Sequence, residues 1–597
     1  MIVKMKKITL LVSERAREDM LKKLRSLGVV HIKNLTAPKG EDIRGVEDRI
    51  SSVTRALAIL STQALDKEAV SMHLDNPHEI EAVTDETLSL SSEREGLSKT
   101  LDGLRASIHW YRPWGAFDPS EIEALKGKGI HVRLYRIQSS QIKKMRDRKD
   151  IHIISKDKTY AYIALVSDDE KLQLPFDEMK LTKESFDRAH SEHDRSEKRI
   201  GEIDILLKEK APYADALKSY ISRLDIKRNF LGVKNGMKKE ARFSCVQGFA
   251  PVDTLGKITA FSSQEGLGYL IEDPSPDDDV PTLVRNPKWI RIINPVFKFM
   301  NTVPGYKELD ISPWFLGFLS LFFAMLIGDA GYGVLFMAAA FFAQRKFKGA
   351  PPEPFRLIYL FASATIVWGA VTGTWFGAER IARFPFFSSM VIDSIDSFVV
   401  GNQNFMIYIC FVIGVVHLTL AHLLLAFDKI NTLKAIAEIG WIAILWGLFF
   451  VAGTLVIGNP FNDIAVKLLI AGTILVLLFS NPRRNILKGI FASLADLPIK
   501  IIGSFSDVVS YLRLFAVGYA SVVLASTFND MALQLGFGNF ISGLAAALIL
   551  FFGHTLNIIL GLMAVIVHGI RLNMLEFSGQ MGMEWSGKEY SPFRETA

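Results

Sequence analysis

Residues 510–520 read SYLRLFAVGYA and place an arginine, Arg513, near the middle of an apolar block at about 499–533. A block of this kind predicts a helix that crosses a bilayer, because about 20 apolar residues span a hydrocarbon core of about 30 Å. The guanidinium group stays charged, and an arginine at the bilayer centre costs about 2.5–3.5 kcal/mol on insertion scales. An arginine in this position therefore indicates a function and needs a carboxylate or a water path nearby.

Helical spacing places small or polar residues on the face of Arg513, with one larger exception. The stripe consists of Ser506, Ser510, Val517, Ala520 and Ser521. Small residues allow a second helix to approach closely. We therefore expect the stripe to face a partner that carries a negative charge.

The next apolar block, at about 538–575, carries a second arginine, Arg571, which shares a helical face with Asn557, Ala564 and His568. At 1.5 Å per residue the block is about 55 Å long, so it is predicted to tilt or to extend into the cytoplasm. Snorkelling of the side chain to the membrane surface is an alternative explanation for Arg571. It explains Arg513 poorly, because about two turns of helix lie on either side.

Seven apolar blocks follow residue 310, and the first contains GDAGYG at 328–333. The blocks lie at about 314–343, 357–378, 405–427, 434–458, 463–480, 499–533 and 538–575. Three glycines and Asp329 favour a helix break where protein or water can satisfy the freed backbone groups. Such a break predicts two short crossings in this block and eight crossings in total.

The distribution of Lys and Arg supports eight crossings with both termini in the cytoplasm. In that topology the outer loops carry Arg380 and Arg383, and the other basic loop residues lie inside. These are Arg345, Lys346, Lys348, Arg356, Lys429, Lys434, Arg483, Arg484, Lys488 and Lys500. Seven crossings would reverse this bias.

The first half of the chain, residues 1–290, is charged and predicted to be cytoplasmic, because the apolar run in MIVKMKKITLLV is too short for a signal peptide. Strand and helix patterns predict small α/β lobes near 1–40, 120–180 and 241–273. The acidic, Pro-rich segment at 273–281 is predicted to be a solvated linker to the membrane half.

Between the lobes, apolar residues spaced by three and four predict coiled-coil arms near 42–111 and 182–233, with a kink at Pro212. Lys210 interrupts the second seam. Paired as an antiparallel hairpin, the arms give an elongated cytoplasmic dumbbell of α+β class. Two exposed helices packed on globular cores are the alternative. An all-α polytopic membrane domain of about eight helices follows at 291–597.

Composition excludes several classes of function. The two cysteines, Cys245 and Cys410, lie in different halves, so neither a disulfide framework nor a cysteine metal site is expected. A net charge of +6 is small for 597 residues and does not indicate nucleic-acid binding. No Walker A sequence occurs, and GDAGYG lacks the spacing of a dinucleotide fingerprint. We therefore expect no ATP hydrolysis by this chain and no cofactor.

Three stretches, SYLRLFAVGYA, HGIRLNMLEF with the trailing YSPF, and FFAMLIGDAGYG, together resemble the membrane stator subunit of V-type and archaeal-type rotary ATPases. This subunit is called a in eukaryotes and I in prokaryotes, and the resemblance covers nearly the whole chain. It implies a non-catalytic subunit of the cell membrane, in which Arg513 faces a ring of proteolipid subunits that each carry one carboxylate. Two offset half-channels would bring protons or Na⁺ to the ring.

By the same resemblance Arg571 is the second arginine of the pair, and the cytoplasmic domain connects to peripheral stalks and to central-stalk or collar subunits. Some eukaryotic relatives have a histidine eight residues after the first arginine. This chain has Ser521 there, so a histidine relay is not implied.

Polar residues of the apolar blocks are candidates for lining the water paths, although a hydrogen bond in helix packing is the alternative for each. They are Asp329, Glu438, Ser506, Asp507, Ser510, Ser521, Asn557 and His568, with His417, His422 and His554 as further candidates. The alternative function is a secondary ion-coupled transporter with a cytoplasmic regulatory domain. The broken first block supports it, but the internal repeats that it predicts are absent.

Overall fold

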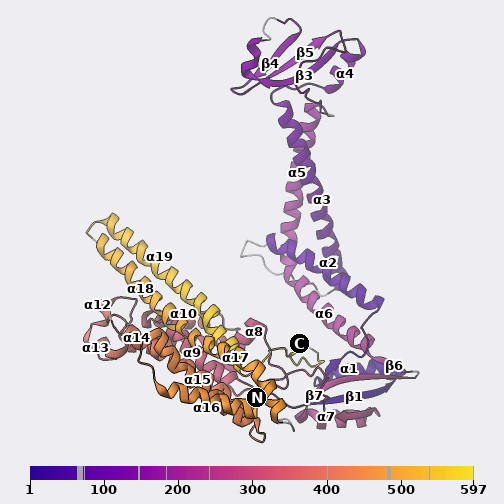
Figure 1. The fold of residues 1–597 in the computed structure, drawn as a ribbon. Coiled ribbons are helices and arrows are strands. Elements are labelled where there is room, and N and C mark those ends of the chain that lie inside the picture. The colour runs from indigo at the N-terminus through magenta and orange to yellow at the C-terminus, as the bar shows by residue number, and fades with distance from the viewer. Residues whose placement is uncertain are drawn as a thin grey trace.

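The computed structural model describes residues 1–595 except 64–71, 73, 75, 145–147, 183, 241, 400, 481–485 and 537. Figure 1 shows one sheet beside the chain termini, long helices that rise from it to a second sheet, and a separate group of apolar helices.

The first sheet combines the two ends of the soluble half in the order β2-β7-β1-β8, with β6 paired to β7. The strands are β1 (Met5–Ser13), β2 (His31–Lys33), β6 (Lys238–Glu240), β7 (Phe243–Pro251) and β8 (Gly268–Glu272). β1 pairs antiparallel with β7 along its whole length, from Met5 opposite Pro251 to Ser13 opposite Phe243.

The segments near 1–40 and 241–273, each predicted to be a small α/β lobe, share one core. Ile8, Leu10 and Val12 of β1 are buried together with residues of α1 (Arg17–Leu27) and α7 (Leu255–Gln264). The inward residues of β1 complete their burial against a helix about 240 positions away, a contact that a short local unit cannot supply.

The second sheet lies at the far end of the long helices and has the antiparallel order β3-β5-β4. Its strands are β3 (His131–Gln138), β4 (Ile151–Lys156) and β5 (Tyr160–Ser167), preceded by α4 (Pro119–Gly127). Tyr135, Ile137, Ile163 and Leu165 form its core.

Four helices connect the two sheets, and they fall on the predicted arms. They are α2 (Glu41–Gln63), α3 (Pro77–Tyr111), α5 (Phe186–Lys210) and α6 (Ala214–Gly236). α3 packs against α5, and α2 against α6. At Pro212, where a kink is predicted, a 3₁₀ turn at Ala211–Tyr213 separates α5 from α6. Lys210, which interrupts the apolar seam, pairs with Glu86 at 2.7 Å.

The segment at 273–281 is not a solvated linker throughout, because two lysines of the first sheet bind its acidic turn. The Asp278 side chain is 5% exposed and lies 3.0 Å from the ammonium groups of both Lys7 and Lys33. It also accepts hydrogen bonds from the backbone N–H and the hydroxyl of Ser275.

The second half of the chain is helical. Its helices are α8 (Asn294–Met300), α9 (Ser312–Ile327), α10 (Ala330–Lys346), α11 (Pro352–Val371), α12 (Glu379–Ala382), α13 (Pro385–Ser388), α14 (Gln403–Asp428), α15 (Lys434–Ala452), α16 (Asp463–Phe479), α17 (Ile486–Ser510), α18 (Leu512–Leu535), α19 (Phe540–Ala564) and α20 (Ser578–Gln580). π-helical turns at Val565–Gly569 (η8) and Leu572–Phe577 (η9) connect α19 to α20.

Within the described residues, five helical stretches are long and apolar enough to cross a membrane, and the bent pair α9–α10 would make six. The five are Pro352–Val371, Gln403–Asp428, Lys434–Ile457, Asp496–Leu535 and Phe540–Gln580. Arg483 and Arg484, which entered the charge count of the loops, lie outside the described residues. The eight crossings stay a prediction.

The helix break predicted at GDAGYG is confirmed. α9 ends at Ile327, Gly328 adopts a left-handed conformation with φ of 68°, and α10 begins at Ala330. The axes of the two helices are bent by 119°. Glycine meets the need for positive φ without the steric cost that a Cβ would add.

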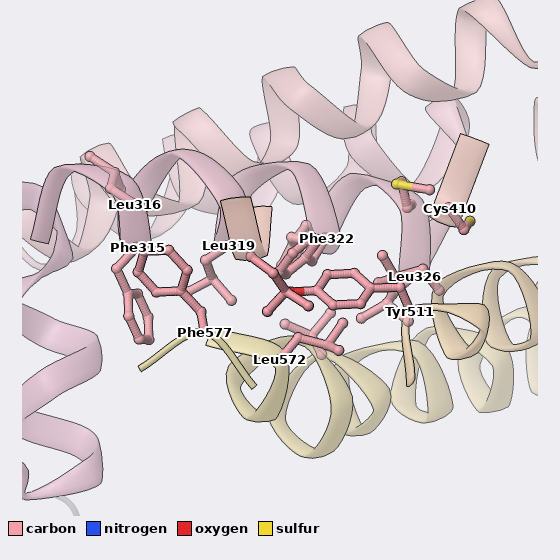
Figure 2. Packing of buried hydrophobic residues seen from close by; sticks show 14 of the residues in the cluster. Phe315, Leu316, Leu319, Phe322, Leu326, Cys410, Tyr511, Leu572 and Phe577 are labelled. Atoms are coloured by element: carbon pink, nitrogen blue, oxygen red, sulfur yellow. The ribbon is translucent and has the colours of Figure 1, made fainter. Parts of the chain in front are cut away.

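A large apolar core ties both arginine-bearing segments to α9. Figure 2 shows Phe315, Leu319 and Phe322 of α9 packed with Tyr511, which precedes α18, and with Leu572 and Phe577 of η9. This packing holds α18 and η9 close together.

A C-terminal strap, defined here as residues 582–595, returns from the membrane helices to the first sheet. The N–H of Thr282 donates to the carbonyl of Lys588 at 2.7 Å, and the N–H of Phe593 donates to the carbonyl of Val30 at 2.8 Å. The Phe593 ring is buried in the core beneath the first sheet. The strap therefore joins the segment after η9 to the soluble half.

Candidate functional site

Arg513 has a carboxylate partner within the same chain. Its Nη2 donates to Oε1 of Glu576 at 2.5 Å, and its Nε donates to the carbonyl of Ser510 at 3.1 Å. The Glu576 side chain is 3% exposed, whereas that of Arg513 is 26% exposed. The guanidinium is thus held from one side by a buried acid and remains reachable from the other.

Arg571 approaches the same oxygen. Its Nε lies 3.6 Å from Oε1 of Glu576, and its side chain is 51% exposed. In a regular α-helix of about 3.6 residues per turn, residues five apart project about 140° away from each other. The π-helical turn η9 bonds residue i to i+5, so it brings Arg571 and Glu576 to the same side.

The predicted stripe on the face of Arg513 divides into exposed and buried parts. Ser506 and Ala520 are exposed, and Ser510 is half-buried. Ser521 is buried, and its hydroxyl donates to Oδ1 of Asn557 on α19 at 3.0 Å. Only part of the stripe is therefore free to meet another protein.

Asn557 belongs to a hydrogen-bonded series between three helices. Its amide nitrogen donates to the Tyr332 hydroxyl at 3.1 Å and to the Ser521 carbonyl at 2.9 Å. The Tyr332 hydroxyl lies 2.7 Å from Nδ1 of His554, whose Nε2 lies 3.1 Å from Oδ1 of Asn529. Asn557 is buried, whereas the Arg571 side chain is 51% exposed. The π-helical turn η8 lies between the two residues, so the regular helical period on which their common face was predicted is interrupted.

Asp329 binds backbone groups at the break between α9 and α10. Its carboxylate accepts four backbone hydrogen bonds, from Gly331 and Tyr332 at the start of α10 and from Phe376 and Gly377 in the following loop. The side chain is 2% exposed. The arrangement matches the alternative explanation for this residue, a hydrogen bond in helix packing, because the backbone groups that Asp329 binds flank the helix break.

A polar cluster with a cavity of about 540 Å³ lies among α14, α15, α17 and α20. Glu438 pairs with Nδ1 of His422 and with the Lys429 ammonium, each at 2.8 Å. Gln580 approaches Nε2 of His422 at 3.2 Å and donates to the Asp507 carboxylate at 2.5 Å. Two of the predicted lining residues, Glu438 and Asp507, thus border the same cavity.

The remaining histidines have different surroundings. His417 is fully buried between the rings of Phe318 and Phe577, with Nδ1 2.8 Å from the Tyr511 hydroxyl. His568, on η8, is half-buried, and its Nδ1 has no hydrogen-bond partner among the described residues. Nε2 of His417 also has no hydrogen-bond partner among the described residues, so the two histidines differ in burial and ring packing.

Sequence reasoning missed Glu576, Gln580 and Lys429 as parts of these sites. The signal for Glu576 was present, since it is a lone acid in the apolar run HGIRLNMLEF. Its spacing of five from Arg571 argued against a contact as long as a regular helix was assumed. Gln580 and Lys429 carry no comparable signal, because both lie at the ends of apolar blocks.

Among the described residues, a possible metal-ligand group consists of His193, Asp194 and Glu197 on α5. One potential ligand atom from each lies within 4.8 Å of the other two. Asp194 and Glu197 are exposed to solvent. The group lies on the soluble half and does not belong to the arginine site.

Comparison with known proteins gives full-length matches. The chain is 31% identical to V-type ATP synthase subunit I of Borreliella burgdorferi and 30% identical to V-type ATP synthase subunit I 1 of Treponema pallidum, and each alignment covers 100% of both chains. It is 26% identical to A-type ATP synthase subunit I of Methanocaldococcus jannaschii over 56% of this chain and 52% of that one. No protein-family profile matches the chain.

Among solved structures, the cytoplasmic N-terminal domain of subunit I, described as a homolog of subunit a of V-ATPase, aligns with 45% of this chain and 99% of that one. The TM-score is 0.24 at 14% identity. The full-length identities show that this chain belongs to the V-type ATP synthase subunit I family.

Proposed function

We propose that the chain is the non-catalytic, ion-translocating stator subunit of a V/A-type rotary ATPase. The observation that carries the proposal is the position of Arg513, a permanent charge within the 40-residue apolar stretch Asp496–Leu535. The Arg513 side chain is 26% exposed, and the small residues Ala516 and Ala520 on its helix are exposed as well. A guanidinium in that setting is suited to meet a carboxylate on a partner helix. Membership of the family favours this function over a secondary transporter.

The partner is a rotating ring of proteolipid subunits, each with one ionisable carboxylate. At an effective dielectric constant of about 20, opposite charges 4 Å apart attract by about 4 kcal/mol. This attraction favours the ionised carboxylate as it passes Arg513, so the carboxylate releases its proton or Na⁺. The fixed positive charge also prevents ions from passing directly between the two half-channels.

The candidate lining residues divide along α17 and α18 into two sets on either side of Arg513. Asp507 precedes Arg513 by six residues and Ser521 follows it by eight, or about 9 Å and 12 Å of helix. We assign the cavity bordered by Asp507 and Glu438 to the inner half-channel. Ser521 and Asn557, with the Tyr332 hydroxyl, are assigned to the outer one.

The soluble half acts as the stator connection to peripheral stalks and to central-stalk or collar subunits. Long helices between two sheets suit this role, because they extend the chain away from the membrane helices (Figure 1). In the proposed topology this dumbbell and the C-terminus are cytoplasmic, and eight crossings lie between them. The ATP site belongs to other subunits.

Two single cysteines test the topology, one at Ser388 and one at Lys348, in a chain without Cys245 and Cys410. In sealed vesicles an impermeant thiol reagent should label the two positions from opposite sides. Labelling of both from the same side would rule out eight crossings.

Replacement of Arg513 by glutamine tests the mechanism. Arg513→Gln keeps a polar side chain of moderate length and removes the charge, so membrane insertion should persist. ATP-driven ion uptake by liposomes that contain the reconstituted complex should be lost, because no charge remains to drive ion release. Near-normal uptake by an assembled Arg513→Gln complex would refute the proposed function.

A further inference from the structure

Glu576 is placed between the two arginines of the site. Nη2 of Arg513 and Nε of Arg571 both approach its Oε1, at 2.5 and 3.6 Å. Its Oε2 is buried without a hydrogen-bond partner among the described residues. One carboxylate oxygen is thus shared by two guanidinium groups, and the other keeps unused acceptor capacity.

Besides the two arginines, titratable side chains on α17 and η8 contribute to the electrostatics of this site. Electrostatic interactions link Glu576 to Asp507 on α17 and link both arginines to His568 on η8. The distances leave Arg513 as the strongest partner of Glu576, since Arg571 is farther away and half exposed.

We propose that Glu576 is a positioning residue that holds Arg513 at the ring interface and competes with the ring carboxylate for its guanidinium. The inference rests on the proposed function, because it requires that Arg513 meets a ring carboxylate. Glu576 itself stays 3% exposed and reaches Arg513 from the protein side. A ring carboxylate would reach the same guanidinium from its exposed side.

Because Glu576 competes with the ring carboxylate, Arg513 has a negatively charged partner at every stage of rotation. A buried charge that loses its counter-ion is strongly destabilised. Without Glu576, each departing ring carboxylate would leave Arg513 uncompensated, and departure would be slow. With Glu576 in place, Arg513 shifts its hydrogen bonds to Oε1 as the ring carboxylate leaves. Arg571 weakens the interaction of Glu576 with Arg513, because both arginines approach the same Oε1.

The experiment compares Glu576→Gln and Glu576→Asp in the reconstituted complex, with ATP-driven ion uptake normalised to the amount of assembled complex. Gln keeps the length and one acceptor oxygen but removes the charge, and we expect uptake to fall at least tenfold. Asp keeps the charge on a shorter side chain and should restore part of the loss. Glu584→Gln, which removes an exposed carboxylate eight residues further on, is the matched control and should transport like the parent.

Transport by Glu576→Gln that equals the parent, or that exceeds transport by Glu576→Asp, would overturn the inference, because side-chain shape and not charge would then matter. If Glu576→Gln does not assemble, the double variant Glu576→Gln/Arg571→Gln decides the question. Assembly restored by removal of one positive charge supports charge compensation. Continued failure to assemble assigns Glu576 to packing and overturns the inference.

Arg513→Gln separates this inference from the proposed function. Loss of transport in Arg513→Gln together with normal transport in Glu576→Gln rejects the competition alone. Normal transport in Arg513→Gln rejects the function on which the competition rests.

Discussion

The two halves of the molecule use ion pairs of similar length under opposite conditions. On the soluble helices, Arg94 lies 2.7 Å from Asp204 of α5, and both side chains are at least 35% exposed. In the membrane half, Arg513 lies 2.5 Å from Glu576, which is 3% exposed. Water and salt weaken the exposed pair, whereas burial makes the loss of either partner costly. Distance alone therefore says little about the importance of an ion pair.

Among the predictions that test the difference between the buried and the exposed ion pair, the largest effect on ion uptake is expected for Arg513→Lys, which retains a positive charge. Lysine lacks the planar fork that reaches both Glu576 and the Ser510 carbonyl, and it can lose its proton in a dry site. We expect coupled ion uptake to fall at least tenfold in an assembled complex, measured in proteoliposomes. Arg571→Gln should reduce uptake less, because Arg571 is half exposed and 3.6 Å from Glu576. The reverse order would show that Arg571 is the essential charge.

The connection between the two halves is tested by Phe593→Ala. The Phe593 ring fills the core beneath the first sheet, and removal of a buried Phe costs about 3–5 kcal/mol. We expect a loss near the lower end of this range, because the strap can detach by itself. Hydrogen exchange of the full chain should show increased exchange in β1 and in the strap. Unchanged exchange in both would contradict the anchoring role of the strap.

A buried acid of the soluble half is tested by Asp278→Asn. Burial disfavours ionisation of Asp278, but hydrogen bonds from Lys33, Lys7 and Ser275 outweigh it and hold the pKa of the carboxyl below its usual value. A lowered folded-state pKa contributes stability above the unfolded pKa of about 3.9, and this stability is lost as the pH falls. We expect Asn to cost about 2 kcal/mol at pH 7.

The stability of the Asp278→Asn variant should fall less steeply than that of the parent as the pH is lowered below about 5. Thermal unfolding of the full chain in detergent at pH 7 and at lower pH would measure both effects. Equal pH dependence of the two proteins would show that the Asp278 pairs do not stabilise the fold.

The smallest effect is expected for Lys210→Met on the soluble helices. Lys210 interrupts an apolar seam and pairs with Glu86, whose side chain is 56% exposed. Met restores the seam, so loss of the pair and gain of apolar contact should nearly cancel, within about 1 kcal/mol. Thermal unfolding would measure the change. A loss of several kcal/mol would show that an exposed pair here matters as much as the buried pair of Arg513.

Local features of the sequence predicted local features of the structure. Pro212 ends α5, because proline cannot donate the helical hydrogen bond. Gly328 ends α9, because positive φ suits glycine. The apolar blocks predicted helices, since periodicity and length are properties of the chain alone. The shared sheet of residues near 1–40 and 241–273 could not be predicted in this way, because the pairing of β1 with β7 is a contact between distant segments.

Composition and local pattern predicted the division into a charged and an apolar half, the helix break at GDAGYG, and an arginine that needs a counter-charge. The identity of the residue that supplies this counter-charge within the chain follows from the packing of distant segments. Glu576 reaches Arg571 because η9 adopts a π-helical turn, and it reaches Arg513 because the core around Tyr511, Leu572 and Phe577 packs η9 against α18. The contact with Arg513 depends on packing between segments about 60 residues apart, and helical periodicity contains no information about such contacts.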